Sequence, residues 1–157
     1  VGMVFQSFNL FPQYTVIENI MLAPKLAAKE QIKQTGEYMG AKSYKEAHEI
    51  IKSNAKSLLE RVGLSEKSES YPCNLSGGQQ QRVAIGRALI TRPSLILADE
   101  PTGNLDSKSA SEVMELLKSA NKQYGQTLIM ITHNLELAEQ ADRMLIIKDG
   151  KLSEGKV

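Results

Sequence analysis

Three short, fully apolar runs separated by helical segments constrain the fold of this chain more than any other feature of its sequence. The runs are residues 95–98 (LILA), 128–131 (LIMI) and 144–147 (MLII). Runs of this kind are typical of strands in a parallel sheet that is covered on both faces. Helices are predicted between them, over 107–124 and 135–141, and this alternation predicts a parallel sheet joined by right-handed crossovers. Asp149 and Gly150 then predict a hairpin turn after the last run.

In the first half of the chain, the main structural signals are helix-capping residues and not apolar runs. Two capping boxes, Thr15 with Glu18 and Ser43 with Glu46, each predict the start of a helix. Only the apolar run at residues 1–5 predicts a strand in this half. The first half is therefore predicted to be mainly helical, and the second half to be α/β.

Composition excludes several classes of protein. The 157 residues correspond to about one domain, and Lys+Arg 19 against Asp+Glu 18 gives a net charge of +1, which provides no general attraction to nucleic acid or anionic membranes. No apolar run approaches the roughly 18 residues of a membrane-spanning helix. The single cysteine, Cys73, excludes an internal disulfide framework and a cysteine-based zinc site. A cytosolic domain is expected, and because the chain opens at Val1 inside a strand-like run, we expect a fragment that begins within a domain.

The first motif that can carry chemistry is the signature segment, residues 75–79, with the sequence Leu-Ser-Gly-Gly-Gln, immediately before a predicted helix. Glycines there let a phosphate approach backbone N–H groups, and the helix dipole favours an anion at this end. A Ser-Gly-Gly cluster is also a common helix cap or turn, so the residues alone leave both interpretations open.

Polar residues follow two of the apolar runs directly. Asp99 and Glu100 come after the first run, and His133 follows the second. The carboxyl ends of parallel strands are where open α/β sheets bind ligands. One carboxylate can hold Mg²⁺ while the other polarises a water, and a histidine can hydrogen-bond a phosphate. A helix cap or a solvated strand end is the alternative for each of these residues.

The order of the motifs resembles the nucleotide-binding domain of ABC transporters over essentially the whole chain. The matching residues are the signature segment, Gln80-Gln81-Arg82, the run 95–98 with Asp99-Glu100 (Walker B and catalytic glutamate), Asn104-Leu105-Asp106 (D-loop), His133 (switch histidine) and Gln6 (Q-loop). The resemblance implies a P-loop NTPase fold of the ABC ATPase type, with a parallel sheet core and a helical subdomain. It divides the chain into residues 1–10 (core strand end and Q-loop), 11–93 (helical subdomain with the signature) and 94–157 (α/β core).

The resemblance also implies a mechanism, in which two such domains, as a homodimer or heterodimer, sandwich two ATP molecules head to tail. Asp99 and Gln6 would coordinate Mg²⁺ with water, Glu100 would be the general base, His133 would hold the γ-phosphate, and Asp106 would couple the two sites. The residues expected to contact the ATP held by the partner are Ser76, Gly77, Gly78 and Gln79. Gln6 and the aromatic segment 8–14 would face a transmembrane permease subunit, although core packing is the alternative for Phe8, Leu10 and Phe11.

One element of the family pattern is absent. No Gly-x-x-x-x-Gly-Lys-Ser/Thr phosphate loop precedes Gln6. The nearest sequence, residues 36–43, has Ala41 between Gly40 and Lys42 and no apolar strand before it, so we reject it. We therefore expect the parent protein to be an ATPase and residues 1–157 alone to be inactive, or the chain to be a truncated remnant that does not hydrolyse ATP.

The transported substrate is indicated only weakly. Residues 5–12 and 18–21, with the triple glutamine 79–81, resemble polar amino-acid importers, which we favour slightly. Residues 99–107 resemble the lipoprotein-releasing and macrolide-exporting branch instead. A soluble ABC ATPase that acts on ribosomes or DNA is a rival class, but it usually has two such domains or a long inserted arm. The transporter interpretation places the protein in the cytoplasm, peripherally on the cytoplasmic face of the plasma membrane, with no nucleic-acid partner.

Overall fold

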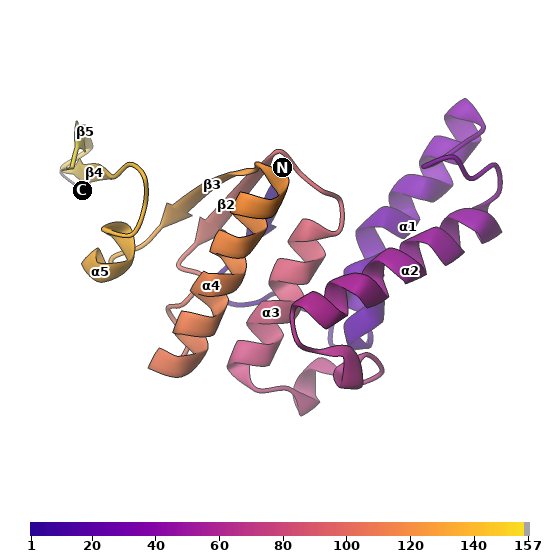
Figure 1. The fold of residues 1–157 in the computed structure, drawn as a ribbon, viewed down its shortest axis with the longest axis horizontal. Helices are drawn as coiled ribbons and strands as arrows, with labels where there is room; N and C mark the ends of the chain where they lie inside the picture. The colour runs from indigo at the N-terminus through magenta and orange to yellow at the C-terminus, as the bar shows by residue number, and fades with distance from the viewer. Residues whose placement is uncertain (156–157) are drawn as a thin grey trace.

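The computed structural model describes residues 1–155 (Figure 1). Its main elements are, in chain order, β1 (Gly2–Val4), α1 (Val16–Thr35), α2 (Tyr44–Arg61), α3 (Gly77–Leu89), β2 (Leu95–Asp99), α4 (Ser107–Tyr124), β3 (Thr127–Ile131), α5 (Leu135–Ala138), β4 (Leu145–Lys148) and β5 (Lys151–Glu154), with short 3₁₀ turns at Ser65–Lys67 and Pro72–Asn74. The mixed α/β fold with a parallel sheet confirms the fold class that the sequence predicts. No helix in residues 1–155 has the length and apolar character needed to cross a membrane.

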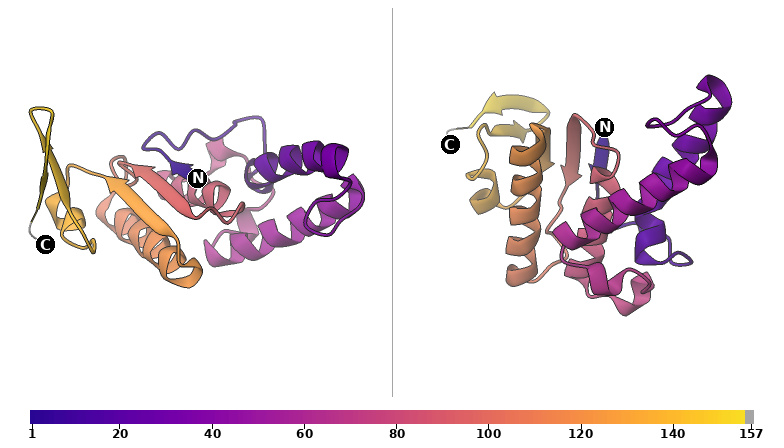
Figure 2. Two further views of the ribbon diagram at one scale, coloured as in Figure 1. Left: turned by 90° about the horizontal axis from the view of Figure 1, so that it is seen from above. Right: turned by 45° about the vertical axis from the view of Figure 1, so that its right-hand side comes forward.

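A three-stranded parallel sheet in the order β1-β2-β3 forms the centre of the molecule. Its register places Val4 beside Ala98, and Ala98 beside Met130. Val4 and Ala98 are buried, and Met130 packs against the same core. Helices α3 and α4, which contact β1 and β3 respectively, lie beside the sheet (Figure 2). Gly2 is needed at the start of β1, because a Cβ there would lie 2.9 Å from the Ala88 carbonyl oxygen of α3.

The opposite face of the sheet is open, contrary to the two-sided burial that the apolar runs predict. Met3, Ile129 and Ile131 are 49%, 50% and 63% exposed, and they alternate along their strands with buried or half-buried neighbours. Within residues 1–155, helices cover only one face of the sheet. Because successive side chains of a strand point to opposite faces, only every second residue of an apolar run is buried. The sequence shows only that these residues are apolar. They are buried only where a helix or another segment packs against that face of the sheet.

The strand predicted at 144–147 forms, but it is not part of the parallel sheet. β4 pairs in antiparallel fashion with β5 across the turn at Asp149 and Gly150, in a separate two-stranded sheet. The predicted helix at 135–141 is reduced to the four residues of α5. A short-range hairpin pairing therefore replaces the crossover to the main sheet that was expected.

Helices α1 and α2 form an antiparallel pair that projects beside the sheet (Figure 1). The Thr15–Glu18 capping box is present in full: the Thr15 side chain accepts from the Glu18 N–H, and the Glu18 carboxylate accepts from the Thr15 N–H at 2.9 Å. The second box is only half formed, because the Glu46 carboxylate accepts from the N–H of Lys42, one residue before Ser43. Residues 36–43 form the loop between these helices, so a helix precedes them and not a strand. A phosphate loop follows a strand, and the structure therefore agrees with the rejection of this segment as a phosphate loop.

Candidate functional site

Residues that follow the three parallel strands gather at one edge of the sheet, which we name the carboxyl edge. It comprises Gln6 after β1, Asp99 and Glu100 at the end of β2, and Thr132 and His133 after β3. The parallel register brings these positions side by side, because Val4, Ala98 and Met130 are already adjacent in the sheet. The structure thus unites three sequence motifs that are up to 127 positions apart.

Glu100 and His133 are in direct contact. Glu100 Oε1 accepts from the His133 backbone N–H at 2.8 Å and lies 2.7 Å from His133 Nδ1. Its other oxygen, Oε2, lies 3.4 Å from the Thr132 hydroxyl, which can donate to it. The side chain of Glu100 is 19% exposed and that of His133 81% exposed, so the carboxylate is held between the strand ends while the imidazole faces solvent. Glu100 has a positive φ of 44°, which turns the chain sharply after β2.

Gln6 is tied to the loop 101–106 that follows Glu100. Gln6 Nε2 donates to Asn104 Oδ1 at 3.2 Å, and Asn104 Nδ2 donates to the Gln6 carbonyl oxygen at the same distance. The Gly103 N–H donates to the Glu100 carbonyl oxygen at 3.1 Å. A continuous hydrogen-bonded network therefore links Gln6, loop 101–106, Glu100 and His133.

The oxygen atoms that remain at the carboxyl edge suit Mg²⁺. Asp99 is exposed, and no group in residues 1–155 hydrogen-bonds to its carboxylate. Gln6 uses its amide nitrogen for Asn104, which leaves Oε1 available. These are the hard oxygen donors that Mg²⁺ prefers, but two of them complete only part of an octahedral shell, and no cluster of three or more His, Cys, Asp or Glu able to hold a metal occurs in the described part of the chain. Phosphate and water oxygens would have to supply the other positions.

The signature segment forms the N-terminus of α3. Ser76 Oγ accepts from the Gln79 N–H at 3.3 Å, and Gln79 Oε1 accepts from the Ser76 N–H at 3.0 Å, which makes a complete capping box. The backbone N–H groups of Gly77 and Gly78 have no acceptor within residues 1–155. The cap that was the alternative interpretation is therefore present, and two helix-end donors are left for an anion.

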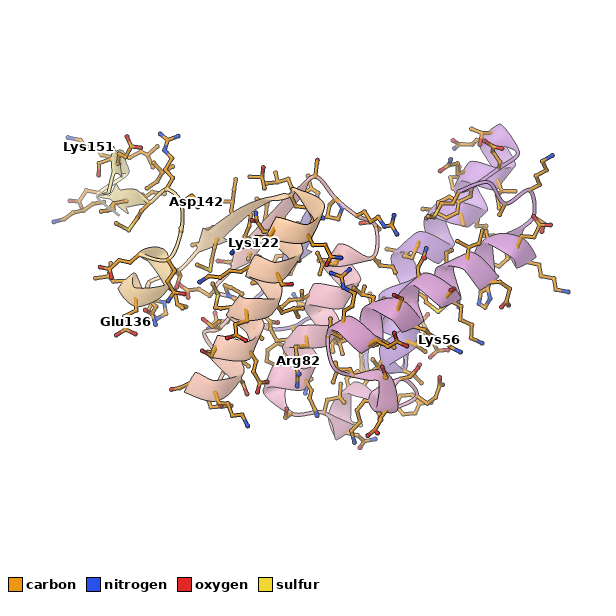
Figure 3. The ribbon with its side chains drawn as sticks, viewed as in Figure 1. Lys56, Arg82, Lys122, Glu136, Asp142 and Lys151 are labelled. Atoms are coloured by element: carbon orange, nitrogen blue, oxygen red, sulfur yellow. The ribbon has the colours of Figure 1, made fainter. Side chains whose placement is uncertain are left out.

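Gly78 packs tightly against the first turn of α4. A Cβ at Gly78 would lie 2.7 Å from Ser109 Oγ and 2.8 Å from Ser109 Cβ, whereas a Cβ at Gly77 would meet ordinary contacts of 3.5 Å or more. An ion pair of 3.8 Å between Arg82 and Glu112 also joins α3 to α4 (Figure 3, where Arg82 is labelled). The signature segment and the start of α4 are thus tightly packed against each other.

Asp106 caps α4 at this contact. Its carboxylate accepts from the Ser109 N–H at 3.0 Å and from the Ser109 hydroxyl at 2.7 Å. These hydrogen bonds lower the pKa of Asp106 below its ordinary value. Asp106 is fixed beside the signature segment by Ser109, with which Gly78 is also in contact.

Stability should depend on the protonation of Asp106. Since its pKa is lowered in the folded state, its contribution is complete above the ordinary pKa of an aspartate and is lost as the pH falls through the folded-state pKa. We expect Asp106→Asn to flatten the acid limb of the stability profile below about pH 4. Urea midpoints measured from pH 6 to pH 2.5 check this, with Asp142→Asn, an exposed aspartate outside any helix cap, as the control. An unchanged acid limb in Asp106→Asn would contradict the prediction.

Two residues near the site have roles that the sequence motifs do not indicate: Gln81 was matched only as part of a motif and Arg87 not at all. Gln81 is fully buried in α3, and Arg87 donates to the carbonyl oxygens of Phe8 (3.0 Å) and Asn9. Burial lowers the pKa of the Arg87 guanidinium. Phe8 and Asn9 both have positive φ, 55° and 50°, so Arg87 stabilises a bend just after Gln6. The sequence feature that could have indicated Gln81 and Arg87 is the presence of polar side chains within a helix whose other residues are mostly apolar and buried.

Known proteins match this chain in sequence over most of its length. The family model described as ABC transporter matches residues 1–103. The chain is 41% identical to the glutamine transport ATP-binding protein GlnQ of Bacillus subtilis, covering 100% of this chain and 58% of GlnQ. It is 43% identical to the macrolide export ATP-binding/permease protein MacB of Rhodopirellula baltica, covering 98% of this chain and 20% of MacB.

The solved structures give the same relationship. The ATP-binding cassette MJ0796, in a dimeric post-hydrolysis state bound to ADP and Pi, matches with a TM-score of 0.73 and 39% identity over 98% of this chain and 62% of that one. The chain thus spans little more than half the length of most relatives described here. A family model that covers most of the chain, together with this structural match, leads to one conclusion: the chain belongs to the ABC transporter family and corresponds to part of its ATP-binding domain.

Proposed function

We propose that this chain is the signature-bearing part of a transport ATPase subunit, which hydrolyses Mg²⁺-ATP at a head-to-tail interface between two such subunits. The observation that carries the proposal is the contact between Glu100 and His133 at the carboxyl edge, beside the free carboxylate of Asp99. A carboxylate fixed in this way can accept a proton from a water at the strand ends. The MJ0796 cassette, dimeric and bound to ADP and Pi, supports the assignment by similarity.

Each residue at the carboxyl edge has a distinct role in this proposal. Asp99 and the Gln6 amide oxygen hold Mg²⁺, which supplies neutralisation of phosphate charge when it is bound. Glu100 takes the proton of the attacking water. His133, whose Nδ1 lies against Glu100, keeps its Nε2 free to hold the γ-phosphate and keeps Glu100 oriented.

The signature segment faces the second subunit. Ser76, Gly77, Gly78 and Gln79 present the N-terminus of α3, with two free N–H groups, to the ATP that the partner holds. Asp106, fixed against this helix by Ser109, passes changes at the interface to loop 101–106 and so to Glu100. We retain the corresponding division of the chain into residues 1–10, 11–93 and 94–157.

The proposed membrane partner is a transmembrane permease subunit, which would place the protein on the cytoplasmic face of the plasma membrane. The segment 8–14 supplies the contact: Phe11 is 41% exposed and its ring lies 5.9 Å from that of Tyr14. Asn19, fully buried, accepts from the Phe11 N–H at 2.8 Å and donates to the carbonyl oxygens of Phe11 and Tyr14, so the segment has a defined shape.

For the substrate we propose polar amino-acid uptake, as in the glutamine transport protein. Lipoprotein release or macrolide export is the second candidate, favoured by residues 99–107 and by the similarity to MacB. The two are separated by purifying the subunit with its permease in lipid vesicles and measuring ATP turnover. Stimulation by glutamine or another polar amino acid with its binding protein supports uptake, whereas stimulation by a macrolide or a lipoprotein supports the second candidate.

The ATPase itself is tested on the protein expressed from the complete reading frame that contains residues 1–157. We expect release of inorganic phosphate from ATP that requires Mg²⁺ and rises steeply with protein concentration, because two subunits form each site. A protein that binds ATP and dimerises but releases no phosphate would overturn the proposal and leave a remnant that does not hydrolyse ATP.

Residues 1–157 expressed alone are expected to show no turnover. They provide the carboxyl edge and the signature segment, but no phosphate loop to hold the ATP phosphates. The same phosphate-release assay checks this, with Glu100→Gln as the control for contaminating ATPases. Mg²⁺-dependent turnover that Glu100→Gln abolishes would contradict the prediction.

A further inference from the structure

Gln81 of α3 is a fully buried amide to which the proposed reaction gives no role. Its Nε2 donates to the carbonyl oxygen of Pro101 at 2.6 Å and to that of Phe5 at 3.3 Å. Its Oε1 is buried and has no hydrogen-bond partner. A polar side chain in this position costs free energy that an apolar one of the same size would avoid, so packing alone does not explain it.

The two carbonyl groups that Gln81 binds flank the site. Phe5 directly precedes Gln6, and Pro101 directly follows Glu100. A hydrogen bond to a carbonyl oxygen restricts the rotation of that peptide plane, and hence the direction in which the neighbouring side chain leaves the backbone. The Phe5 carbonyl lies in the peptide plane shared with Gln6, and the Pro101 carbonyl lies in the plane between Pro101 and Thr102, in the loop that begins directly after Glu100. One side chain therefore restrains the backbone at Gln6 and in the loop that follows Glu100.

Gln81 also belongs to the helix that begins with the signature segment. It lies one helical turn beyond Gly77, so a displacement of the N-terminus of α3 displaces Gln81 with it. The links from Gln6 to Asn104 and from Glu100 to His133 do not involve α3. The other contacts of α3 with this region, from Arg87 to Phe8 and Asn9 and from Gly78 to Ser109, are made further from Gln6 and Glu100 in the sequence.

We propose that Gln81 is a positioning residue, which holds Gln6 and Glu100 in a fixed relation to the signature helix. The inference rests on the proposed roles of Gln6 and Glu100. Occupation of the signature segment by the partner's ATP then changes the geometry of this subunit's own base and metal ligand through this buried amide, beside the route through Ser109 and Asp106.

The chain contains a matched control in Gln126. This glutamine is also buried, donates from Nε2 to a proline carbonyl oxygen (Pro93) at 2.6 Å, and has an unpartnered Oε1. It lies just before β3, at the opposite end of the sheet from the carboxyl edge. Gln81→Met and Gln126→Met therefore remove the same kind of interaction, near the site and away from it.

The first measurement is amide hydrogen exchange on the protein from the complete reading frame, without nucleotide. We expect Gln81→Met to speed exchange about fivefold or more at residues 6–9 and 100–106, and Gln126→Met to leave these segments unchanged. Equal effects of the two variants on these segments, or none in Gln81→Met, would overturn the proposal. Gln81→Asn, which keeps an amide but shortens its reach, is assessed by the same criteria if the methionine variant does not fold.

The second measurement is steady-state ATP hydrolysis. Gln81→Met is expected to lower kcat about 10- to 100-fold and to raise the Mg²⁺ concentration needed for half-maximal rate, with a smaller change in KM for ATP. Gln126→Met should retain kcat when both variants are compared at equal folded fraction. A loss of kcat of the same size in both variants overturns the proposal. If the unmodified protein shows no turnover, the proposed function has failed, and hydrogen exchange still decides the role of Gln81.

Discussion

Glu100→Gln is expected to lower Mg²⁺-dependent ATP turnover by about 10²- to 10⁴-fold, the usual contribution of a general base. The substitution keeps the size of the side chain. It also keeps an oxygen that can accept from the His133 N–H, which lies 2.8 Å from Glu100 Oε1 in the native protein. It removes the negative charge that would take the proton from water. Binding of ATP and dimer formation should therefore persist while the chemical step stops.

The control for this prediction is Glu136→Gln, at an exposed glutamate of α5 that Figure 3 labels. It changes the net charge by the same amount and should leave turnover within about twofold, as expected for a surface substitution. Single-turnover phosphate release separates the chemical step from binding. Turnover of Glu100→Gln within tenfold of the unmodified protein would assign the base to another residue.

The second large effect is expected at Gly78. Gly78→Ala would place a Cβ 2.7 Å from Ser109 Oγ and 2.8 Å from Ser109 Cβ, so α3 and α4 must separate. Overpacking of this kind costs about 1–3 kcal/mol in the free energy of unfolding. Because Ser109 also holds Asp106, ATP turnover should fall further than stability alone explains.

Gly77 provides the comparison. A Cβ there meets Leu105 Cδ2 at 3.5 Å and Phe8 Cζ at 3.6 Å, which are ordinary contacts. Gly77→Ala should therefore be neutral or stabilise the protein by up to about 1 kcal/mol through helix propensity. Urea unfolding of both variants checks the difference, and a double-mutant cycle with Ser109→Gly should recover part of the loss at Gly78. Equal unfolding free energies for Gly77→Ala and Gly78→Ala would contradict this account.

The elements that the sequence predicts best are those with signals at both ends. Helix α4 has the predicted bounds, because the Asp106 side chain caps its start and Gly125, in the left-handed conformation, ends it. The complete capping box of α1 is likewise a short-range interaction. Such interactions depend on residues three or four positions apart, so a single sequence reveals them.

Features that depend on distant contacts were predicted wrongly or not at all. The apolar runs predict burial on both faces, but whether a face is covered depends on which other segments are present. The 144–147 strand pairs with its hairpin neighbour instead of joining the main sheet. The contacts of Gln81 and Arg87 join residues 20 to 79 positions apart, so no local pattern marks them. The candidate site was predictable as a set of residues through the family resemblance, whereas the hydrogen bonds that connect them were not.

The β4–β5 ribbon has a consequence for how the chain is cut by proteases. All eight residues of the two strands are exposed, and a hairpin of two strands that packs on no core has little stability of its own. Arg143, Lys148 and Lys151 lie in or beside it (Lys151 is labelled in Figure 3), so brief trypsin treatment should cleave there first. The product that ends at residue 143 keeps the whole parallel sheet, α1 to α4 and every residue of the carboxyl edge. Limited digestion would therefore remove the ribbon and leave the parallel sheet and the carboxyl edge intact.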